Sequence, residues 1–275
     1  MKKQLEKTKL SIVVLNRNTK DFLRQCLASL PQIESYQIIV VDNASTDGSI
    51  AMIKKEFPKV ELVLNSENIG FTRGNNAARK VARGEYLLFL NSDTKVFPKT
   101  LETMVQFMDE DPKIGISTCL SLLPSGKLYY ACHRGFPTPW NSLLYFLGLP
   151  SNYNGSFWPI NKIHEIDACS GSFLLIRRTL LEEINWFDED YFAYGEDIEM
   201  CYRAKELGYK VMFNPAVKII HFWRSSKGTK QWNDARSQAM KIFYDKHYHQ
   251  KYPELFRSIV FKGIDLMNKL RRGKD

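Results

Sequence analysis

Residues 10–57 read LSIVVLNRNTKDFLRQCLASLPQIESYQIIVVDNASTDGSIAMIKKEF, and the alternation of apolar and amphipathic segments within them indicates the fold class. Two short apolar runs, LSIVVLN and YQIIVVDN, are each followed by an amphipathic segment, which predicts helices over 19–30 and 47–57. The pattern then repeats, because KVELVLN precedes an expected helix over 71–82 and EYLLFLN precedes one over about 98–109. Apolar strands that alternate with helices indicate an α/β fold with a mainly parallel sheet of right-handed βαβ units.

Beyond Gly115 the alternation of apolar strands and amphipathic helices changes. ISTCLSLL and KLYYACHR flank a Pro-Ser-Gly turn and predict a hairpin, a small antiparallel element. The aromatic stretch over 136–159 is either an insertion that covers the site or a passive surface loop. The pattern further predicts a strand in EIDACSGSFLLIRR, a short helix to Asn185, a helix over 196–207 and a strand in KVMFNPAVKIIHF.

Composition excludes several classes of protein. A hydrophobic fraction of 44% suits a packed core and argues against global disorder. No run approaches the roughly 18 apolar residues of a spanning helix, and MKKQLEKTK does not lead into a signal-peptide core, so we expect a cytoplasmic protein. The five cysteines form no CxxC pair and lie in apolar segments, as reduced core thiols do.

The formal charge of +9 implies an anionic partner. Nucleic acid is excluded because the surplus lies at the two ends, in MKKQLEKTK and KLRRGK, and no nucleic-acid motif accompanies it. The tail from Trp232 onward is basic and amphipathic, so it either docks peripherally on the anionic inner face of the plasma membrane or packs as a helical pair. In the second case it packs on the catalytic domain or on a second subunit of a homodimer.

Polar residues stand where the predicted strands end, at Asn16, Asp42, Asn65, Asn91 and Asp93. Ligands of parallel sheets bind beyond the carboxyl ends of the strands. The Asp42 carboxylate can accept a hydrogen bond from a nucleobase or ribose, or it is merely a solvated strand end. We therefore expect the binding site at this edge.

The segment NIGFTRGNNAA, with two glycines before a helix, brings backbone amides and the cation of Arg73 to the same edge. We interpret Arg73 as a nucleotide contact, although two glycines before a helix are also common loop chemistry. A nicotinamide-dependent dehydrogenase is excluded, because LNRNTKD replaces the GxGxxG motif that such enzymes need after the first strand.

Two segments offer ligands for a metal and a diphosphate. In FLNSDTK, Asp93 is placed to hold Mg²⁺ or Mn²⁺ beside a diphosphate, or else it caps the following turn. In IIHFWRSSKG, His221 ends a strand and is either structural or a metal ligand, and Lys227 lies in a basic loop that can neutralise a leaving phosphate.

The segment YFAYGEDIEMCYRAKELG places Glu196, Asp197 and Glu199 in the first turn of a helix. Acids at that position stabilise the helix dipole, which alone can explain Glu199. Asp197 lies at the mouth of the same sheet, where a carboxylate can remove the proton of an acceptor hydroxyl. Its neighbour Glu196 would help to set its pKa.

Together these strings resemble the family 2 glycosyltransferases, especially the bacterial branch that contains rhamnosyltransferases of cell-wall and O-antigen assembly. The anchors arrive in the family's order between about Leu10 and Lys227: SIVVLNRN, VDNASTDGS, NIGFTRGNN, FLNSD, DACSGSFLLIRR and FDEDYFAYGEDIEMCYR. The resemblance implies a GT-A fold and an inverting transfer from a nucleotide-diphosphate sugar, dTDP-rhamnose or a UDP-sugar, in cell-surface polysaccharide synthesis. The acceptor would be a glycan or a lipid-linked oligosaccharide.

The resemblance also implies a role for each matching residue. Asp197 and Glu196 would be catalytic, Asp93 and His221 would bind Mn²⁺ or Mg²⁺, and Gly171 with Ser172 would lie on the acceptor side. The nucleotide-sugar contacts would be Asn16, Asp42, Arg73, Asn76, Asn91, Ser92 and Lys227. This chain departs from the family's metal motif, which often begins with Asp, because it has Asn91 there.

We expect a catalytic domain over 1–230, with a nucleotide-binding half at about 8–115 and an acceptor half at about 116–230, and a helical tail over 231–275. Two other functions compete. A sugar-1-phosphate nucleotidylyltransferase would need a Gly-rich loop after the first strand, which LNRNTKDF lacks. A non-catalytic glycan-binding or scaffold protein on the same fold is disfavoured by the presence of both Asp93 and Asp197.

Overall fold

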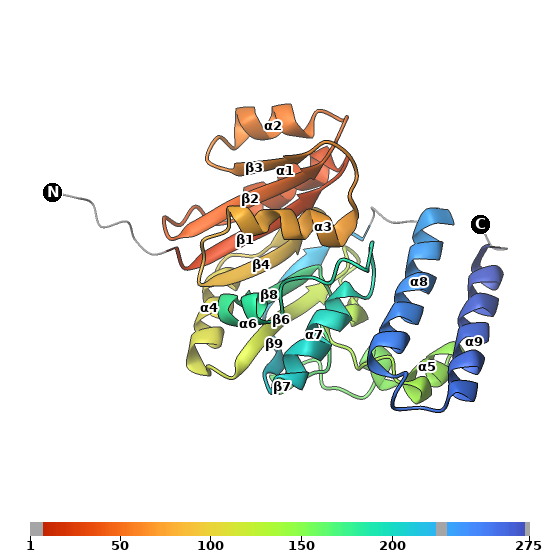
Figure 1. Ribbon diagram of the computed structural model, residues 1–275. Helices are drawn as coiled ribbons and strands as arrows, with labels where there is room; N and C mark the ends of the chain where they lie inside the picture. Colours follow the sequence, from red (N-terminus) through yellow and green to blue (C-terminus); the bar gives the residue numbers. More distant parts are fainter. Residues whose placement is uncertain (1–7, 224–229, 273–275) are drawn as a thin grey trace.

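The first half of the chain forms a parallel sheet, as the sequence predicts. The computed structural model describes residues 8–223 and 230–272 (Figure 1). Its first four long strands are β1 (Leu10–Asn16), β2 (Tyr36–Asn43), β3 (Glu61–Asn65) and β4 (Tyr86–Asn91). They pair in parallel in the order β3-β2-β1-β4. The connections contain α1 (Lys20–Ser29), α2 (Ser49–Glu56), α3 (Gly70–Asn76) and a 3₁₀ turn (Ala77–Lys80).

The second half extends the same sheet with strands of both directions. β8 (Phe173–Arg177) lies antiparallel between β4 and β6 (Ile114–Leu122), and β6 is parallel to β9 (Lys210–His221). The short strands β5 (Thr94–Val96) and β7 (His164–Glu165) pair antiparallel with β9. The helices of this half are α4 (Thr100–Glu110), α6 (Arg178–Glu183) and α7 (Glu196–Glu206). The expected α/β class with a mostly parallel sheet is confirmed.

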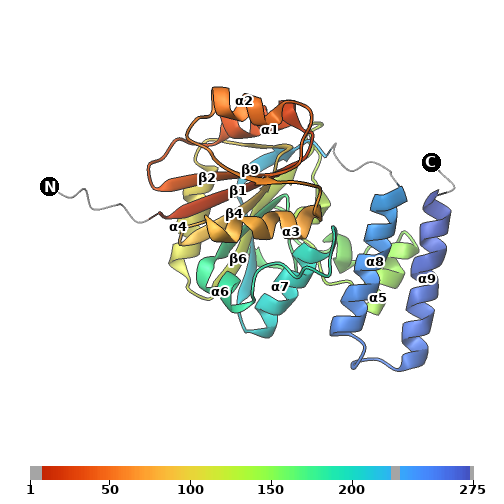
Figure 2. The same cartoon turned by 45° about the horizontal axis from the view of Figure 1, so that its top comes forward.

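Both faces of the strands β1, β2 and β4 are buried, which explains why these strands are continuously apolar. Alternate residues of β1 point to opposite faces: Ile12 packs with Leu23 of α1 and Met104 of α4, while Val13 belongs to the layer that includes Met200 of α7. Figure 2 shows α1 and α2 on one side of the sheet and α6 and α7 on the other. Full burial of such side chains stabilises the fold by about 1.5–3 kcal/mol each.

Two sequence predictions need correction. The hairpin after β6 is limited to one bridge, Leu122 with Leu128, and the chain then enters a 3₁₀ helix, Tyr130–Cys132. The strand expected throughout EIDACSGSFLLIRR is divided into β7 and β8, and the intervening Ser170–Ser172 segment lines a cavity. Local strand patterning failed at both places because the two segments pair with each other, through a bridge between Arg134 and Ala168, which lie far apart in the chain.

The tail forms two helices, α8 (Lys230–His247) and α9 (Glu254–Arg272), and a further helix, α5 (Pro139–Phe146), lies within the aromatic stretch. α8 packs on the α/β region, because Ala239, Phe243 and Tyr244 join the same apolar layer as α7. α9 packs along α8 (Figures 1 and 2). Within the described residues, none of the helices combines the length and the apolar character needed to span a bilayer.

Candidate active site

A cavity of about 730 Å³ opens at the carboxyl ends of the parallel strands. Its walls include residues from the ends of β1, β2 and β4, from the segments before β8 and after β6 that hold Ser170 and Arg134, from the start of α7, and from α8. The volume lies within the range of about 300–1,000 Å³ that is usual for ligand pockets. α8 contributes Arg236, Ala239, Met240 and Phe243 to this wall, so the C-terminal helices help to build the site.

Asp93 and His221 meet at one side of the cavity. β5 begins directly after Asp93 and pairs with the end of β9, which sets Thr94 opposite His221. The Asp93 Oδ1 atom lies 3.2 Å from His221 Nε2, and the side-chain amide of Asn91 lies 3.5 Å from the same nitrogen. The Tyr129 ring packs edge-on against the imidazole at 4.8 Å.

The donor set on this side fits a divalent cation that is shared with a phosphate ligand. His221 Nδ1 is buried with no hydrogen-bond partner in the described chain. The described residues contain no group of three or more His, Cys, Asp or Glu side chains placed to hold a metal ion. A metal here would take the Asp93 carboxylate, the His221 imidazole and the Asn91 carbonyl oxygen. Mg²⁺ and Mn²⁺ accept few protein ligands when phosphate oxygens and water complete the shell.

Asp197 lies on another side of the cavity, in the first turn of α7. Its Oδ2 atom accepts hydrogen bonds from Arg134 Nη2 at 2.7 Å and from the Gly171 amide at 3.0 Å. Its Oδ1 atom accepts one from the Ile198 amide at 2.8 Å. These three donors fix the orientation of the carboxylate.

Sequence reasoning missed Arg134. Its guanidinium forms the buried ion pair with Asp197 and also lines the cavity. The residue is held in place by its backbone, which exchanges hydrogen bonds of 2.9 and 2.8 Å with Ala168. Arg134 and Asp197 are 63 positions apart and no local motif marks the arginine, so only the fold reveals the pair.

Glu196, the neighbour of Asp197, is a buried carboxyl group that also lines the cavity. It is 5% exposed, and its Oε2 atom has no hydrogen-bond partner in the described residues. Burial, reinforced by the charge of Asp197, raises the pKa of Glu196 to about 8. Glu196 is therefore mainly protonated at neutral pH, and a neutral carboxyl group can donate a hydrogen bond.

This shift gives a pH-dependent stability. Glu196 has an ordinary pKa of 4.5 and a pKa of about 8 in the folded chain, so between these values the folded state binds one more proton than the unfolded state. Its contribution to stability is therefore lost as pH rises from about 5 to 8, at up to ~1.4 kcal/mol per pH unit. Glu196→Gln should leave Tm almost unchanged at pH 5 and raise it progressively towards pH 8.5. Glu183→Gln, an exposed site, controls for net charge; parallel curves for wild type and Glu196→Gln would refute the prediction.

The segment Gly171–Ser172 connects the two sides of the site. The Ser172 carbonyl oxygen accepts from the Asn91 amide at 3.3 Å, and the Gly171 amide donates to Asp197. A Cβ atom at Gly171 would lie 3.4 Å from the Phe71 ring, an ordinary contact within the protein. The protein itself therefore has room for a Cβ atom at this position.

Two of the predicted nucleotide contacts lie beside the cavity rather than on its lining. The Asn16 amide donates to Asp42 Oδ2 at 2.7 Å and to Ser45 Oγ at 3.0 Å, and Asp42 Oδ1 accepts from the Ser45 amide at 2.7 Å. Both side chains are buried and shape the turns that follow β1 and β2. Among the predicted nucleotide contacts, Asn91 and Ser92 do line the cavity, and Ser92 accepts a hydrogen bond from Thr19 at 2.8 Å.

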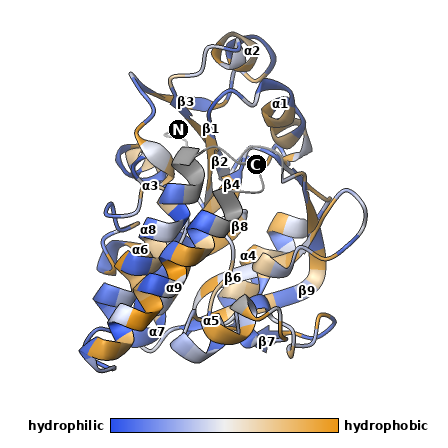
Figure 3. Cartoon of the chain, turned by 90° about the vertical axis from the view of Figure 1, so that its right-hand side faces the viewer, coloured by the Kyte–Doolittle hydropathy of each residue, from blue (hydrophilic) through white to orange (hydrophobic). Residues whose placement is uncertain are grey.

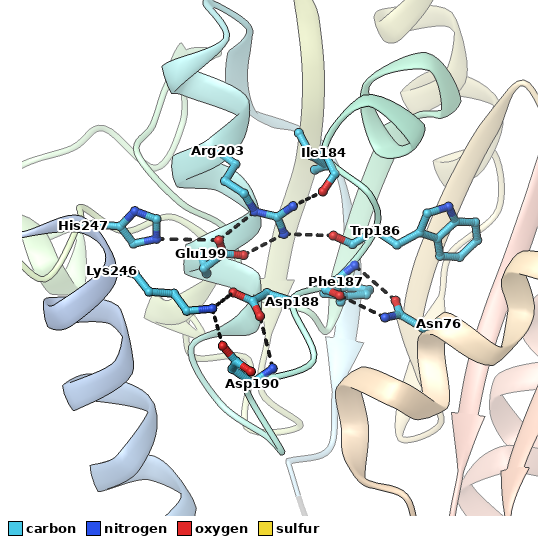
Figure 4. A network of polar contacts seen from close by, with 10 residues as sticks. All are labelled: Asn76, Ile184, Trp186, Phe187, Asp188, Asp190, Glu199, Arg203, Lys246 and His247. Atoms are coloured by element: carbon cyan, nitrogen blue, oxygen red, sulfur yellow. Dashed lines mark hydrogen bonds and ion pairs between the residues drawn. The ribbon is translucent and has the colours of Figure 1, made fainter.

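Arg73 and Asn76 lie away from the cavity lining. Arg73 is 61% exposed and pairs with Glu189 at 3.3 Å. Asn76 exchanges hydrogen bonds of 2.9 and 3.1 Å with the backbone of Phe187 (Figure 4). Lys227 lies outside the described residues.

A polar network behind α7 holds the surrounding loops in place. Glu199 forms two hydrogen bonds of 2.7 Å with Arg203, which also donates to the backbone oxygens of Ile184 and Trp186 (Figure 4). From α8, Lys246 pairs with Asp188 and Asp190, and His247 lies 3.6 Å from Glu199. The network ties α7, α8 and the 184–190 loop together, so Glu199 has a structural role.

Comparisons with known proteins identify the family. Residues 11–185 match glycosyl transferase family 2. The chain is 27% identical over 265 residues to the rhamnosyltransferase WbbL of Escherichia coli, covering 92% of this chain and 93% of that protein. It is 25% identical over 247 residues to the N-acetylglucosaminyl-diphospho-decaprenol L-rhamnosyltransferase of Mycobacterium tuberculosis, covering 80% and 78%. It is 38% identical over 273 residues to the poly(ribitol-phosphate) beta-glucosyltransferase of Bacillus spizizenii, covering 87% and 40%.

Solved structures support the same fold. The mannosyltransferase PcManGT of Pyrobaculum calidifontis, solved in complex with GDP-Man and Mn²⁺, superposes with a TM-score of 0.64 at 20% identity and covers 96% of this chain and 72% of that chain. This likeness confirms the expected GT-A fold. The family match also decides against the nucleotidylyltransferase and the non-catalytic alternatives. The chain belongs to glycosyl transferase family 2 and is a glycosyltransferase.

Proposed function

We propose that this enzyme transfers a sugar from a nucleoside-diphosphate donor to an acceptor hydroxyl, with inversion of configuration, in the synthesis of a cell-surface polysaccharide. One observation carries the proposal. A single cavity holds a pair suited to a metal and diphosphate, Asp93 with His221, and a fixed carboxylate, Asp197, with Gly171 and Ser172 between them.

On the donor side, Asp93, His221 and Asn91 would hold a divalent cation together with the diphosphate. When bound, the metal supplies a positive charge that offsets the negative charge of the leaving group. The polar residues at the end of β1, Arg17, Asn18 and Thr19, line the same cavity and are in place to bind the donor. A direct contact of the nucleotide with Asn16, Asp42, Arg73, Asn76 or Lys227 stays a prediction.

On the acceptor side, Asp197 would act as the general base. The acceptor oxygen forms a bond to the anomeric carbon while its proton passes to the Asp197 carboxylate. The bond between that carbon and the diphosphate oxygen breaks, and its electron pair leaves with the nucleoside diphosphate. Because attack and departure are in line, the configuration inverts. Arg134 and the Gly171 amide hold the carboxylate in one orientation, which favours this proton transfer.

The relatives favour particular substrates. Two of them are rhamnosyltransferases, and the name of the Mycobacterium tuberculosis enzyme specifies a lipid-linked acceptor, an N-acetylglucosaminyl-diphospho-decaprenol. We propose dTDP-rhamnose, or failing that a UDP-sugar, as the donor. The acceptor would be a glycan carried on a lipid diphosphate. Mn²⁺ or Mg²⁺ would be the cofactor, in line with the Mn²⁺ of the Pyrobaculum calidifontis complex.

A thermal-shift panel tests the donor. A ligand at 100 times its Kd stabilises the folded state by about 2.7 kcal/mol, which corresponds to roughly 5–10 °C for a domain of this size. We expect that dTDP-rhamnose or a UDP-sugar with Mn²⁺ raises Tm by this amount, and that nucleoside triphosphates raise it less. The absence of a shift with every nucleotide sugar would contradict the proposal.

A further inference from the structure

The outward side of α9 is apolar where a solvated helix is normally polar. Ile264 is 3% exposed and lies on the inner side of the helix, whereas Leu255, Ile259 and Leu266 are 74%, 58% and 59% exposed. At 3.6 residues per turn these three side chains fall within about 40° of one another and about 140–180° from Ile264. α9 thus carries a second apolar stripe, opposite its core side.

Two lysines belong to the same stripe. Lys262 and Lys269 project about 20–80° from the three apolar side chains by the same helical geometry. Within the described residues neither lysine forms an ion pair, in contrast to Lys241, which pairs with Asp265 at 2.6 Å. We call Leu255, Ile259, Lys262, Leu266 and Lys269 the α9 stripe.

A second apolar group lies on α5 and the residues that follow it. Trp140, Leu143, Leu147 and Leu149 are 66%, 46%, 63% and 47% exposed. Figures 1 and 2 both show α5 beside the α8–α9 hairpin, and in Figure 3 α5 and α9 face the viewer on the same side of the molecule. One side of the protein therefore holds two separate segments that carry exposed apolar side chains.

The charge of the C-terminal helices indicates the chemistry of the partner. Residues 230–272 contain ten Lys or Arg against four Asp or Glu, a net charge of +6. Apolar side chains flanked by unpaired lysines suit an anionic lipid surface, because the apolar groups enter the boundary of the acyl chains while the ammonium groups stay among the headgroups. A second copy would bring the same positive charge and be repelled.

We propose that the α9 stripe, together with α5, docks the enzyme on an anionic lipid bilayer. The surface reaches the active site through Tyr145, a residue of α5 that also lines the cavity. An acceptor sugar could then enter the cavity while its lipid stays in the bilayer. This use of the surface rests on the proposed function, whereas the lipid contact itself does not.

Flotation with phosphatidylcholine vesicles, with and without phosphatidylglycerol, tests the surface. The full chain should float only with the anionic vesicles. Ile259→Gln/Leu266→Gln should lower the partition coefficient at least about tenfold, because two apolar side chains no longer enter the boundary region. Lys262→Gln/Lys269→Gln should lower it by about fivefold per lysine, and raised salt should do the same to wild type. The matched control is Leu64→Gln/Leu207→Gln, at two leucines that are 53% and 47% exposed on other elements, and it should float as wild type does.

Three results would overturn the proposal: no flotation of wild type with anionic vesicles, equal flotation of the Ile259→Gln/Leu266→Gln variant, or a dimer in sedimentation velocity that this variant converts to monomer. The last would identify a second copy as the partner. Hydrolysis of the nucleotide-sugar donor in solution separates this proposal from the proposed function. The stripe variants should hydrolyse the donor at the wild-type rate, and a chain that floats but never consumes a nucleotide sugar would refute the proposed function alone.

Discussion

Asp197→Asn should lower kcat by about 10²–10⁴-fold, the usual effect of removing a general base. Asparagine keeps the shape of the side chain, and its oxygen can still accept from Arg134 or the Gly171 amide. It can no longer take the acceptor proton. The Kd of the nucleotide sugar, measured by calorimetry, should change by less than about twofold, since the loss concerns the transition state alone. Release of nucleoside diphosphate gives the turnover.

The ion pair with Arg134 requires a matched variant. Asp197→Asn leaves a buried guanidinium without its counter-charge, and breaking a buried pair typically costs about 3–5 kcal/mol. The double variant Arg134→Gln/Asp197→Asn should recover much of the lost Tm but none of the turnover. Arg134→Gln alone should retain part of the turnover, because the base is still present. Recovery of activity in the double variant would mean that Asp197 acts only through the fold.

Glu196→Gln provides the comparison with a neighbouring carboxyl group. We expect a loss of turnover of less than about tenfold, because Glu196 is already mainly protonated at neutral pH and is a poor base in that form. A large loss of turnover in Glu196→Gln, together with near-normal turnover in Asp197→Asn, would identify Glu196 and not Asp197 as the base.

Metal removal should abolish turnover, and Mn²⁺ or Mg²⁺ should restore it. Asp93→Ala removes the carboxylate and His221→Ala removes the imidazole 3.2 Å from it. Each substitution should weaken Mn²⁺ binding by at least about 10–100-fold, which is the usual effect of losing a residue that supports a metal ligand. Mn²⁺ titration followed by electron paramagnetic resonance, in the presence of the nucleoside diphosphate, measures binding without relying on activity.

Asn91→Asp is the converse substitution, because it adds a carboxylate to the proposed metal site. It restores the acidic residue that often begins the family's metal motif, and the extra charge should tighten Mn²⁺ binding. The side chains of Asn91 and His221 lie 3.5 Å apart. If both hold the same ion, the gain in Mn²⁺ affinity from Asn91→Asp should disappear in the double variant Asn91→Asp/His221→Ala. Full turnover in the presence of a chelator would refute the assigned role of Asp93 and His221.

The sequence was sufficient for the parts of the fold that depend on local pattern. The apolar runs at β1, β2 and β4 and the acid-rich start of α7 appear where the periodicity predicts them. The antiparallel insertion of β8 between β4 and β6 was not predictable, because strand order depends on contacts between residues far apart in the chain.

The site was predictable to a similar degree. Strand ends located Asn91, Asp93 and His221 at one edge, and the structure brings these three together. Strand position does not give the direction of a side chain, however, and Asn16 and Asp42 bond to each other instead of lining the cavity. Arg134 has no sequence signal at all, since its place depends on the backbone pairing with Ala168.

A single displacement at the anomeric carbon, with Asp197 as the base on the acceptor side, inverts the configuration of that carbon. The most direct measurement is the one-bond carbon–proton NMR coupling constant at the anomeric carbon, in the donor chosen by the thermal-shift panel and in the transferred sugar of the product, because it differs between the two anomers even for rhamnose. We expect opposite anomeric configurations in donor and product. Retention of the donor's configuration would contradict it.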